Sequence, residues 1–236
     1  TVDTQDAAAQ VVTPDLCEGI RSDLVELRFG FDTLSPGDDL LALQPGAAVF
    51  GSLGGIILGT SDPTNHPLTL YDSEGVGGAD PDLERNSTGT GMWEFGNLGS
   101  TPVGNAMIIN EDTNLAIPND YGSGGQIVFT SDIMLEYLSF EFLDIDQGEE
   151  ANTVLIVENT TTGNSLSIPF INFEETSGSI FAVPGVDFGN RAGNRVVDVT
   201  DVGVPFGQFN QFTFDLDSSG AVPEICIGAP QTVLSV

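Results

Sequence analysis

Short clusters of acidic residues are the part of this 236-residue sequence best suited to chemistry. Two clusters place acids at alternate positions, in the pairs Asp80 with Asp82 and Asp144 with Asp146. This spacing lets both carboxylates converge from a loop or from one face of a strand. Calcium takes about six to eight oxygen ligands, which include carboxylates and the backbone carbonyls of glycine-rich loops. The acidic segments are 71–74, 78–84, 110–112, 119–120 and 144–146.

The charge balance of the chain favours a bound cation at such clusters. There are 35 acidic residues against 5 basic ones, a net charge of −30, and every basic residue is an arginine. Crowded carboxylates repel one another, and their pKa values rise unless a cation balances them. The sequence therefore predicts calcium in the loop region. The alternative is solvated turn residues, because Asp and Asn side chains bond to nearby backbone groups, and none of these acids falls in the EF-hand pattern.

The same charge also excludes two classes of partner. A polyanion is repelled by the phosphates of nucleic acids and by anionic lipid surfaces. No stretch reaches the length of apolar sequence that spans a membrane. An acidic coat for solubility in sea water or brine would give a similar composition, and it is compatible with specific calcium binding.

Residues for catalysis are sparse, so we expect a protein that is not an enzyme. The single histidine, His66, precedes a proline in a turn-like segment. There is no Gly-X-Ser-X-Gly motif and no lysine for a phosphate loop. A glycosidase with paired carboxylates stays open, but nothing in the sequence selects two of the acids.

Three aromatic residues lie near the acidic loops. The only tryptophan, Trp93, stands in a glycine-rich segment, and Tyr71 and Tyr121 flank acidic positions. Such rings can stack on a sugar face, which makes these three residues candidates for carbohydrate binding. The alternative that we favour for Trp93 is a plug at one end of the core.

The cysteines and the two sequons suggest an extracellular protein. Cys17 and Cys226 lie near opposite ends of the chain, and we expect a disulfide between them rather than two unrelated buried thiols. Asn86 and Asn159 begin Asn-X-Ser/Thr sequons, which are weak signals for glycans. The polar start at Thr1 is typical of a mature end left by processing.

Alternation of apolar and polar residues predicts many short strands. Val25, Leu27 and Phe29 alternate with Glu26 and Arg28, which is the period of a half-buried strand. Gly, Pro, Asn and Asp clusters separate the strands, and no long apolar stripe has helical spacing. Further strands are predicted at 47–58, 68–71, 106–110, 126–130, 135–143, 153–158, 165–170, 179–183, 195–199, 208–216 and 223–227.

This pattern predicts an all-β fold, an antiparallel β-sandwich of jelly-roll type. Within 135–143, Leu138, Phe140 and Phe142 point to the core. We expect an extended arm at 1–15, a single sandwich at 16–228, and a tail or exchanged strand at 229–236. The segment from Ser73 to Gly104 has no strand pattern, and so long a loop is typical of function or of ordering by a metal.

Several motifs occur in a distinctive order along the chain: LYDS at 70–73, GADPDL at 78–83, GNAMIINED at 104–112, NDYGSGG at 119–125, LDID at 143–146 and SSGAV at 218–222. This order resembles a family of secreted β-sandwich domains of marine bacteria and some algae, many of which carry a C-terminal sorting tail. The resemblance implies a surface, matrix or adhesive role. It also implies calcium ligands at Asp72, Asp80, Asp82, Glu111, Asp112, Asp144 and Asp146. This chain departs from the family in showing no obvious sorting tail after Ile227.

We therefore expect an extracellular, calcium-stabilised structural or adhesive protein. Its partners would be other copies of itself, joined where an exposed sheet edge accepts a terminal strand, or surface glycans. The alternative is a calcium-dependent carbohydrate-binding module. A polysaccharide hydrolase is the least expected of the three.

Overall fold

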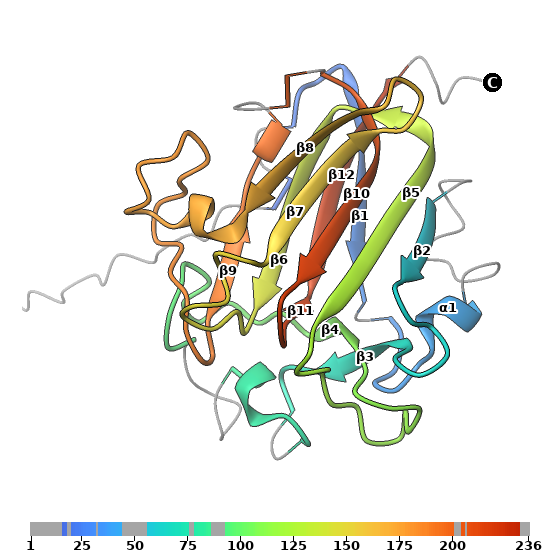
Figure 1. Cartoon of the computed structure of the whole chain (residues 1–236), viewed down its shortest axis with the longest axis vertical. Coiled ribbons are helices and arrows are strands. Elements are labelled where there is room, and N and C mark those ends of the chain that lie inside the picture. The colour runs from blue at the N-terminus through green and yellow to red at the C-terminus, as the bar shows by residue number, and fades with distance from the viewer. Residues whose placement is uncertain are drawn as a thin grey trace, which may run out of the picture.

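The computed structural model consists of two antiparallel β-sheets packed together as a sandwich, as Figure 1 shows. It describes residues 16–17, 20–31, 33–43, 56–75, 78–85, 93–200, 204–205 and 207–231. The all-β sandwich predicted from the alternation is therefore confirmed. No helix among these residues is long and apolar enough to cross a membrane.

The first sheet has seven strands, and its main path runs β1-β12-β6-β11-β4-β3, while β9 pairs with β6. Their bounds are β1 Leu24–Gly30, β3 Leu68–Asp72, β4 Asn105–Ile109, β6 Tyr137–Leu143, β9 Gly193–Val196, β11 Ala221–Val222 and β12 Glu224–Pro230. The second sheet has five strands in the order β2-β5-β10-β7-β8. Their bounds are β2 Ile56–Thr60, β5 Gly125–Leu135, β7 Val154–Asn159, β8 Asn164–Pro169 and β10 Phe209–Leu216. The described part of the chain also has three short helical segments: α1 Leu40–Leu43, η1 Pro81–Leu83 and η2 Phe170–Phe173.

Phenylalanines fill the space between the sheets. The ring of Phe140 on β6 meets the ring of Phe214 on β10 edge to face, with 5.0 Å between centroids. Phe129 on β5 stacks on Phe212 at 4.6 Å. All four side chains are fully buried, and burial of such large rings is a major source of folding free energy.

The first sheet is covered on its outer face as well. Every residue of β6 is buried, so Ser139 and Glu141 are enclosed although they point away from Phe140 and Phe142. One cover is a small apolar cluster that includes Leu83 of η1. Its other members are Tyr71, Trp93, Leu98, Val103, Ala106, Ile108, Leu143 and Ala221. The described residues of the segment 73–104 therefore form a lid on this sheet.

The second cover is tied down by the expected disulfide. Cys17 and Cys226 are bonded, which joins the segment before β1 to the strand β12. Their neighbours Leu16, Leu24 and Tyr137 form a separate buried group on the outer face. In the chain-entropy view, closing so long a loop stabilises the fold by about 4–5 kcal/mol as an upper figure.

One predicted strand is wrong. Residues 179–183 form turns rather than a strand, and Ile180 is 69% exposed. The Ser179 hydroxyl accepts a hydrogen bond from the backbone N–H of Phe181, a local bond that competes with strand pairing. Gly178 and Gly185, both with positive φ, bend the chain on either side. Sequence reasoning also missed β11, which is only two residues long.

Several expectations fall outside the described residues. They are the arm at 1–15, most of the predicted strand at 47–58, the sequon at Asn86, and the end of the tail at 232–236.

Candidate cation site

A capped turn of η1 brings two of the predicted carboxylates together. Asp80 is the N-cap of this helix, and its Oδ1 accepts a hydrogen bond of 3.1 Å from the backbone N–H of Asp82. Pro81 occupies the first helical position, where its missing N–H costs nothing. The cap fixes the backbone so that both carboxylates belong to the same turn.

Asp144 enters the same place from the end of β6. It has φ of 55°, an uncommon conformation for a residue with a side chain, and it is only 4% exposed. Its Oδ1 accepts a hydrogen bond of 3.1 Å from the backbone N–H of Arg191. One carboxylate oxygen from each of Asp80, Asp82 and Asp144 lies within 4.8 Å of the other two.

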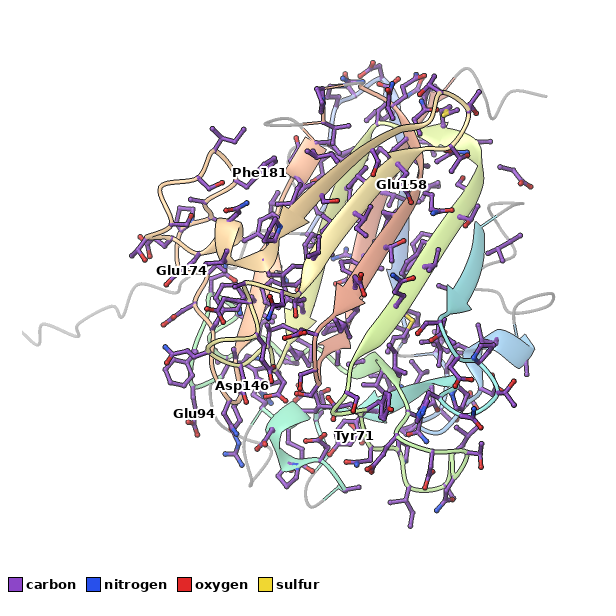
Figure 2. All side chains as sticks on the ribbon, in the orientation of Figure 1. Tyr71, Glu94, Asp146, Glu158, Glu174 and Phe181 are labelled. Atoms are coloured by element: carbon purple, nitrogen blue, oxygen red, sulfur yellow. A yellow bond between two sulfur atoms is a disulfide. The ribbon has the colours of Figure 1, made fainter. Side chains whose placement is uncertain are left out.

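This separation fits oxygens that share one calcium ion. With metal–oxygen distances of about 2.3–2.6 Å, two ligands of the same ion are at most about 5 Å apart. Asp146, half-buried two residues after Asp144, interacts electrostatically with Asp82. Figure 2 shows Asp146 and Tyr71 at the same end of the sandwich.

A fifth acid, Asp120, joins this group although sequence reasoning did not select it. Asp120 is 6% exposed, and its Oδ2 accepts a hydrogen bond of 2.7 Å from the backbone N–H of Gly220. Its carboxyl group is also in hydrogen-bond contact with that of Asp80. We call these five residues, Asp80, Asp82, Asp120, Asp144 and Asp146, the carboxylate cluster.

Burial and mutual repulsion raise pKa values in the metal-free cluster. Burial, followed by the neighbouring Asp80 carboxyl, raises the pKa of Asp120 to about 9. Burial also raises the pKa of Asp144 to about 7, although the N–H of Arg191 opposes the shift. The pKa of Asp146 is raised by burial and by the charge of Asp82. The cluster therefore holds protons at neutral pH unless a cation replaces them.

The arginines of the chain are engaged with other acids. Each of the five forms an ion pair outside the cluster: Arg21 with Asp23 and Glu136, Arg28 with Glu224, Arg85 with Glu74, Arg191 with Glu94, and Arg195 with Glu141. Asp80, Asp82 and Asp144 offer hard oxygen ligands, which suit calcium, while the absence of His and Cys among them disfavours softer metals.

Three of the predicted calcium ligands lie elsewhere and are exposed, Asp72 at the end of β3 and the other two in a turn. The Oδ1 of Asp72 accepts a hydrogen bond from the N–H of Glu74, and the Oδ1 of Asp112 accepts one from Asn114. Glu111 is exposed and accepts a hydrogen bond from the side-chain amide of Asn119. These contacts match the alternative of turn residues that cap nearby backbone and amide groups.

The aromatic candidates for sugar binding are largely enclosed. Trp93 is 4% exposed, and its burial favours the plug over a stacking platform. Tyr71 is buried, donates a hydrogen bond to the backbone carbonyl of Asp80, and has its pKa raised by burial and by the charge of Glu84. Tyr121 stacks on His66, with 3.7 Å between ring centroids.

The asparagine side chain of the second sequon is also engaged in hydrogen bonds within the protein. Asn159 is buried, its amide nitrogen donates to the carbonyl of Gln208, and its Oδ1 accepts from the N–H of Thr162. These bonds hold the turn after β7, and they argue against a glycan on this side chain.

Comparison with solved structures gives matches that include one weak likeness to a carbohydrate-binding module. A mutant of the family 29 carbohydrate-binding module CBM29-2 matches at 15% sequence identity over 53% of this chain and 67% of that chain, with a TM-score of 0.26. Neither protein-family models nor curated proteins give a match. The functional argument therefore rests on the geometry of the site.

Proposed function

We propose that this chain is an extracellular structural or adhesive domain that binds calcium at the carboxylate cluster. The observation that carries the proposal is the convergence of Asp80, Asp82 and Asp144, two of which approach from η1 and one from the end of β6. The disulfide supports an oxidising, extracellular setting.

The ion would link the lid to the sheet that it covers. Leu83, the residue after Asp82, packs in the apolar cluster that covers the outer face. Asp144 directly follows the last residue of β6, and Asp120 is bonded to Gly220 just before β11. A cation shared by these carboxylates would fasten the lid to the strands beneath it. Extracellular calcium modules have dissociation constants of about 10⁻⁴ to 10⁻³ M, and we expect a value in this range.

Native mass spectrometry in calcium tests the site directly. The test variant is the double substitution Asp80→Asn with Asp82→Asn, which should lose the bound ion. The matched control is Glu111→Gln with Asp112→Asn, which removes the same charge from an exposed turn and should keep the ion. The proposed site would be overturned if the test variant kept its calcium, or if the wild type bound none.

The self-assembly part of the proposal needs its own measurement. Assembly through terminal strands remains an expectation from the alternating sequence of the tail, and it would use the open edge of a sheet. Electron microscopy with and without EDTA would show calcium-dependent polymers. Monodisperse monomers in both solutions would remove the assembly and leave the calcium site untouched.

A further inference from the structure

The carboxylate cluster includes a peptide bond with its own chemistry. The sequence has two Asp–Pro bonds, Asp62–Pro63 and Asp80–Pro81. In such a bond the side-chain carboxylate can attack the backbone carbonyl carbon of the same residue and close a cyclic anhydride, while the proline nitrogen leaves as a secondary amine. The Asp80–Pro81 bond lies at the start of η1, and its surroundings favour this reaction.

The cap of η1 places the nucleophile next to this bond. The Oδ1 of Asp80 accepts a hydrogen bond of 3.1 Å from the backbone N–H of Asp82, and this hydrogen bond spans the peptide bond between Asp80 and Pro81. The carboxyl group of Asp80 also contacts that of Asp120. The carboxylate is therefore held against the peptide bond that it would attack, which removes part of the entropic cost of the attack.

A buried hydroxyl group donates to the carbonyl of the same bond. The hydroxyl of Tyr71 lies 2.5 Å from the backbone carbonyl oxygen of Asp80, and Tyr71, labelled in Figure 2, is 3% exposed. Burial and the charge of Glu84 raise the pKa of Tyr71, so the hydroxyl keeps its proton and remains a donor. A donor fixed on a carbonyl oxygen stabilises the negative charge that develops there when the carbon is attacked.

The reaction also needs water, and the structure provides access on one side. A cavity of about 390 Å³ is lined by residues on both sides of this segment, among them Tyr71, Gly78, Ala79 and Glu84. Water in this cavity lies next to the residue that precedes Asp80. The nucleophile, the polarised carbonyl and a supply of water therefore meet at one turn.

The other Asp–Pro bond has different surroundings. Both carboxylate oxygens of Asp62 are engaged by Asn65, Oδ1 by its backbone N–H and Oδ2 by its side-chain amide. The backbone carbonyl of Asp62 accepts from the backbone N–H of His66 in the same turn. The chain thus contains an internal reference, a bond of the same sequence held in an ordinary turn.

We propose that the Asp80–Pro81 bond is a self-cleavage site of the metal-free protein. The Asp80 carboxylate attacks its own carbonyl carbon, and the C–N bond to Pro81 breaks. The proline nitrogen takes a proton from water, and the hydroxide that remains opens the anhydride to two carboxyl groups. One water molecule is consumed, and the products are the fragments 1–80 and 81–236.

Two features of the structure would control the outcome. The disulfide between Cys17 and Cys226 joins the two fragments, so cleavage would free the lid at one point without releasing a piece of the protein. A calcium ion in the carboxylate cluster would hold the Asp80 carboxylate as a ligand and withdraw it from the reaction. Only this protection by calcium rests on the proposed function.

Intact-mass spectrometry of the full chain, with and without reduction, tests the reaction after incubation in neutral buffer. In EDTA, the reduced chain should separate into 1–80 and 81–236, while the unreduced chain stays whole and gains the mass of one water. At free calcium about 100 times the dissociation constant, cleavage should be about 100-fold slower, because about one chain in a hundred is metal-free. An intact chain in EDTA would overturn the self-cleavage and leave the calcium site standing. Equal rates in both solutions would count against Asp80 as a calcium ligand and leave the self-cleavage standing.

Variants identify the reacting groups. Asp80→Ser keeps an oxygen that caps η1 and removes the nucleophile, so cleavage should stop. Tyr71→Phe keeps the buried ring and removes the hydroxyl, which should slow cleavage by about 100-fold. Asp62→Ser and Tyr137→Phe make the same two changes elsewhere and should cleave as the wild type does. A thermal scan confirms that each variant folds, and Pro81→Ala, which gives a poorer leaving group, should also slow the reaction.

Three results with these proteins would overturn the proposal. The first is cleavage at the same place in Asp80→Ser. The second is a wild-type rate in both Pro81→Ala and a folded Tyr71→Phe. The third is equal cleavage of the wild type at Asp62–Pro63, which would show only the general lability of Asp–Pro bonds.

Discussion

Two groups of buried charge lie within strand β6 and directly after it, and they are balanced in different ways. Glu141, within the strand, is paired with Arg195 on β9, and both side chains are buried. Three residues later, Asp144 lies among other carboxylates at the end of the strand. The chain places an arginine where an acid is enclosed within the sheet, and it leaves the strand end to protons or to a cation.

The ion pair also shows what burial costs when a base is present. Burial still raises the pKa of Glu141 to about 7, although Arg195 favours the charged form. The attraction of an ion pair offsets the free energy lost by removing both charges from water only when the geometry and the hydrogen bonds of the pair are good. In the carboxylate cluster the neighbours are themselves acids, so their charges add to the shift instead of opposing it.

The largest expected effect is the loss of the arginine. Arg195→Met leaves Glu141 buried without its cation and should lower the free energy of unfolding by about 3–5 kcal/mol, measured by urea titration in calcium. Arg21→Met removes an exposed arginine from its ion pairs with Asp23 and Glu136 and should cost no more than about 1 kcal/mol. A double variant, Glu141→Leu with Arg195→Met, should recover part of the loss. Equal effects of Arg195→Met and Arg21→Met would contradict the role assigned to the buried pair.

Calcium should stabilise the protein through the carboxylate cluster alone, without affecting the pair of Glu141 and Arg195. At a free concentration of about 100 times its dissociation constant, an ion that binds only the folded state raises the free energy of unfolding by about 2.7 kcal/mol. The increment between calcium and EDTA should be the same in the wild type and in Arg195→Met, because the two groups are compensated independently. If the wild type is equally stable in both solutions, the cluster is balanced without the ion.

The effect of a single substitution at the cluster on the free energy of unfolding should have opposite signs in EDTA and in calcium. Asp82→Asn removes one repelling charge, so in EDTA it should stabilise the protein by about 1 kcal/mol. In calcium it removes a ligand and should destabilise the protein by about 1–2 kcal/mol. Thermal unfolding in the two solutions measures both values. Asp112→Asn, in an exposed turn, should shift neither by more than about 0.5 kcal/mol, and an identical response of the two variants would refute the distinction.

The two groups also differ in how far the sequence predicts them. Alternation along 135–143 correctly assigned Phe140 and Phe142 to the core. It gave no sign that Glu141 on the opposite face is buried too, because the covers come from segments distant in the chain. Period-two patterning reports which face a side chain takes, and it carries no information about what lies on that face.

The cluster was predictable only where ligands are close in sequence. The alternate spacing of Asp80 with Asp82 did bring both carboxylates to one turn. The acidic segment 119–120 was noted in the sequence, but nothing there joins Asp120 to the other four acids, because its partner Gly220 lies 100 residues away. Asp72 and Asp112 look the same in sequence as Asp80 and Asp82 of the carboxylate cluster, because a short acidic run is typical both of capped turns and of metal loops.

The most gradual expected effect is the pH dependence of the metal-free cluster. In EDTA, Asp120 and Asp144 hold protons in the folded state that they lose in the unfolded state near pH 4, because their folded pKa values are about 9 and about 7. Their stabilising effect is therefore complete below about pH 4 and declines as pH rises, by at most about 1.4 kcal/mol per pH unit for each proton. Glu141 contributes to the decline only up to about pH 7, so the interval from 7 to 9 isolates Asp120. Urea titrations across this interval should show stability falling in EDTA and nearly level in calcium, where the ion replaces the protons. A fall of the same slope in both solutions would mean that the cluster keeps its protons and binds no cation.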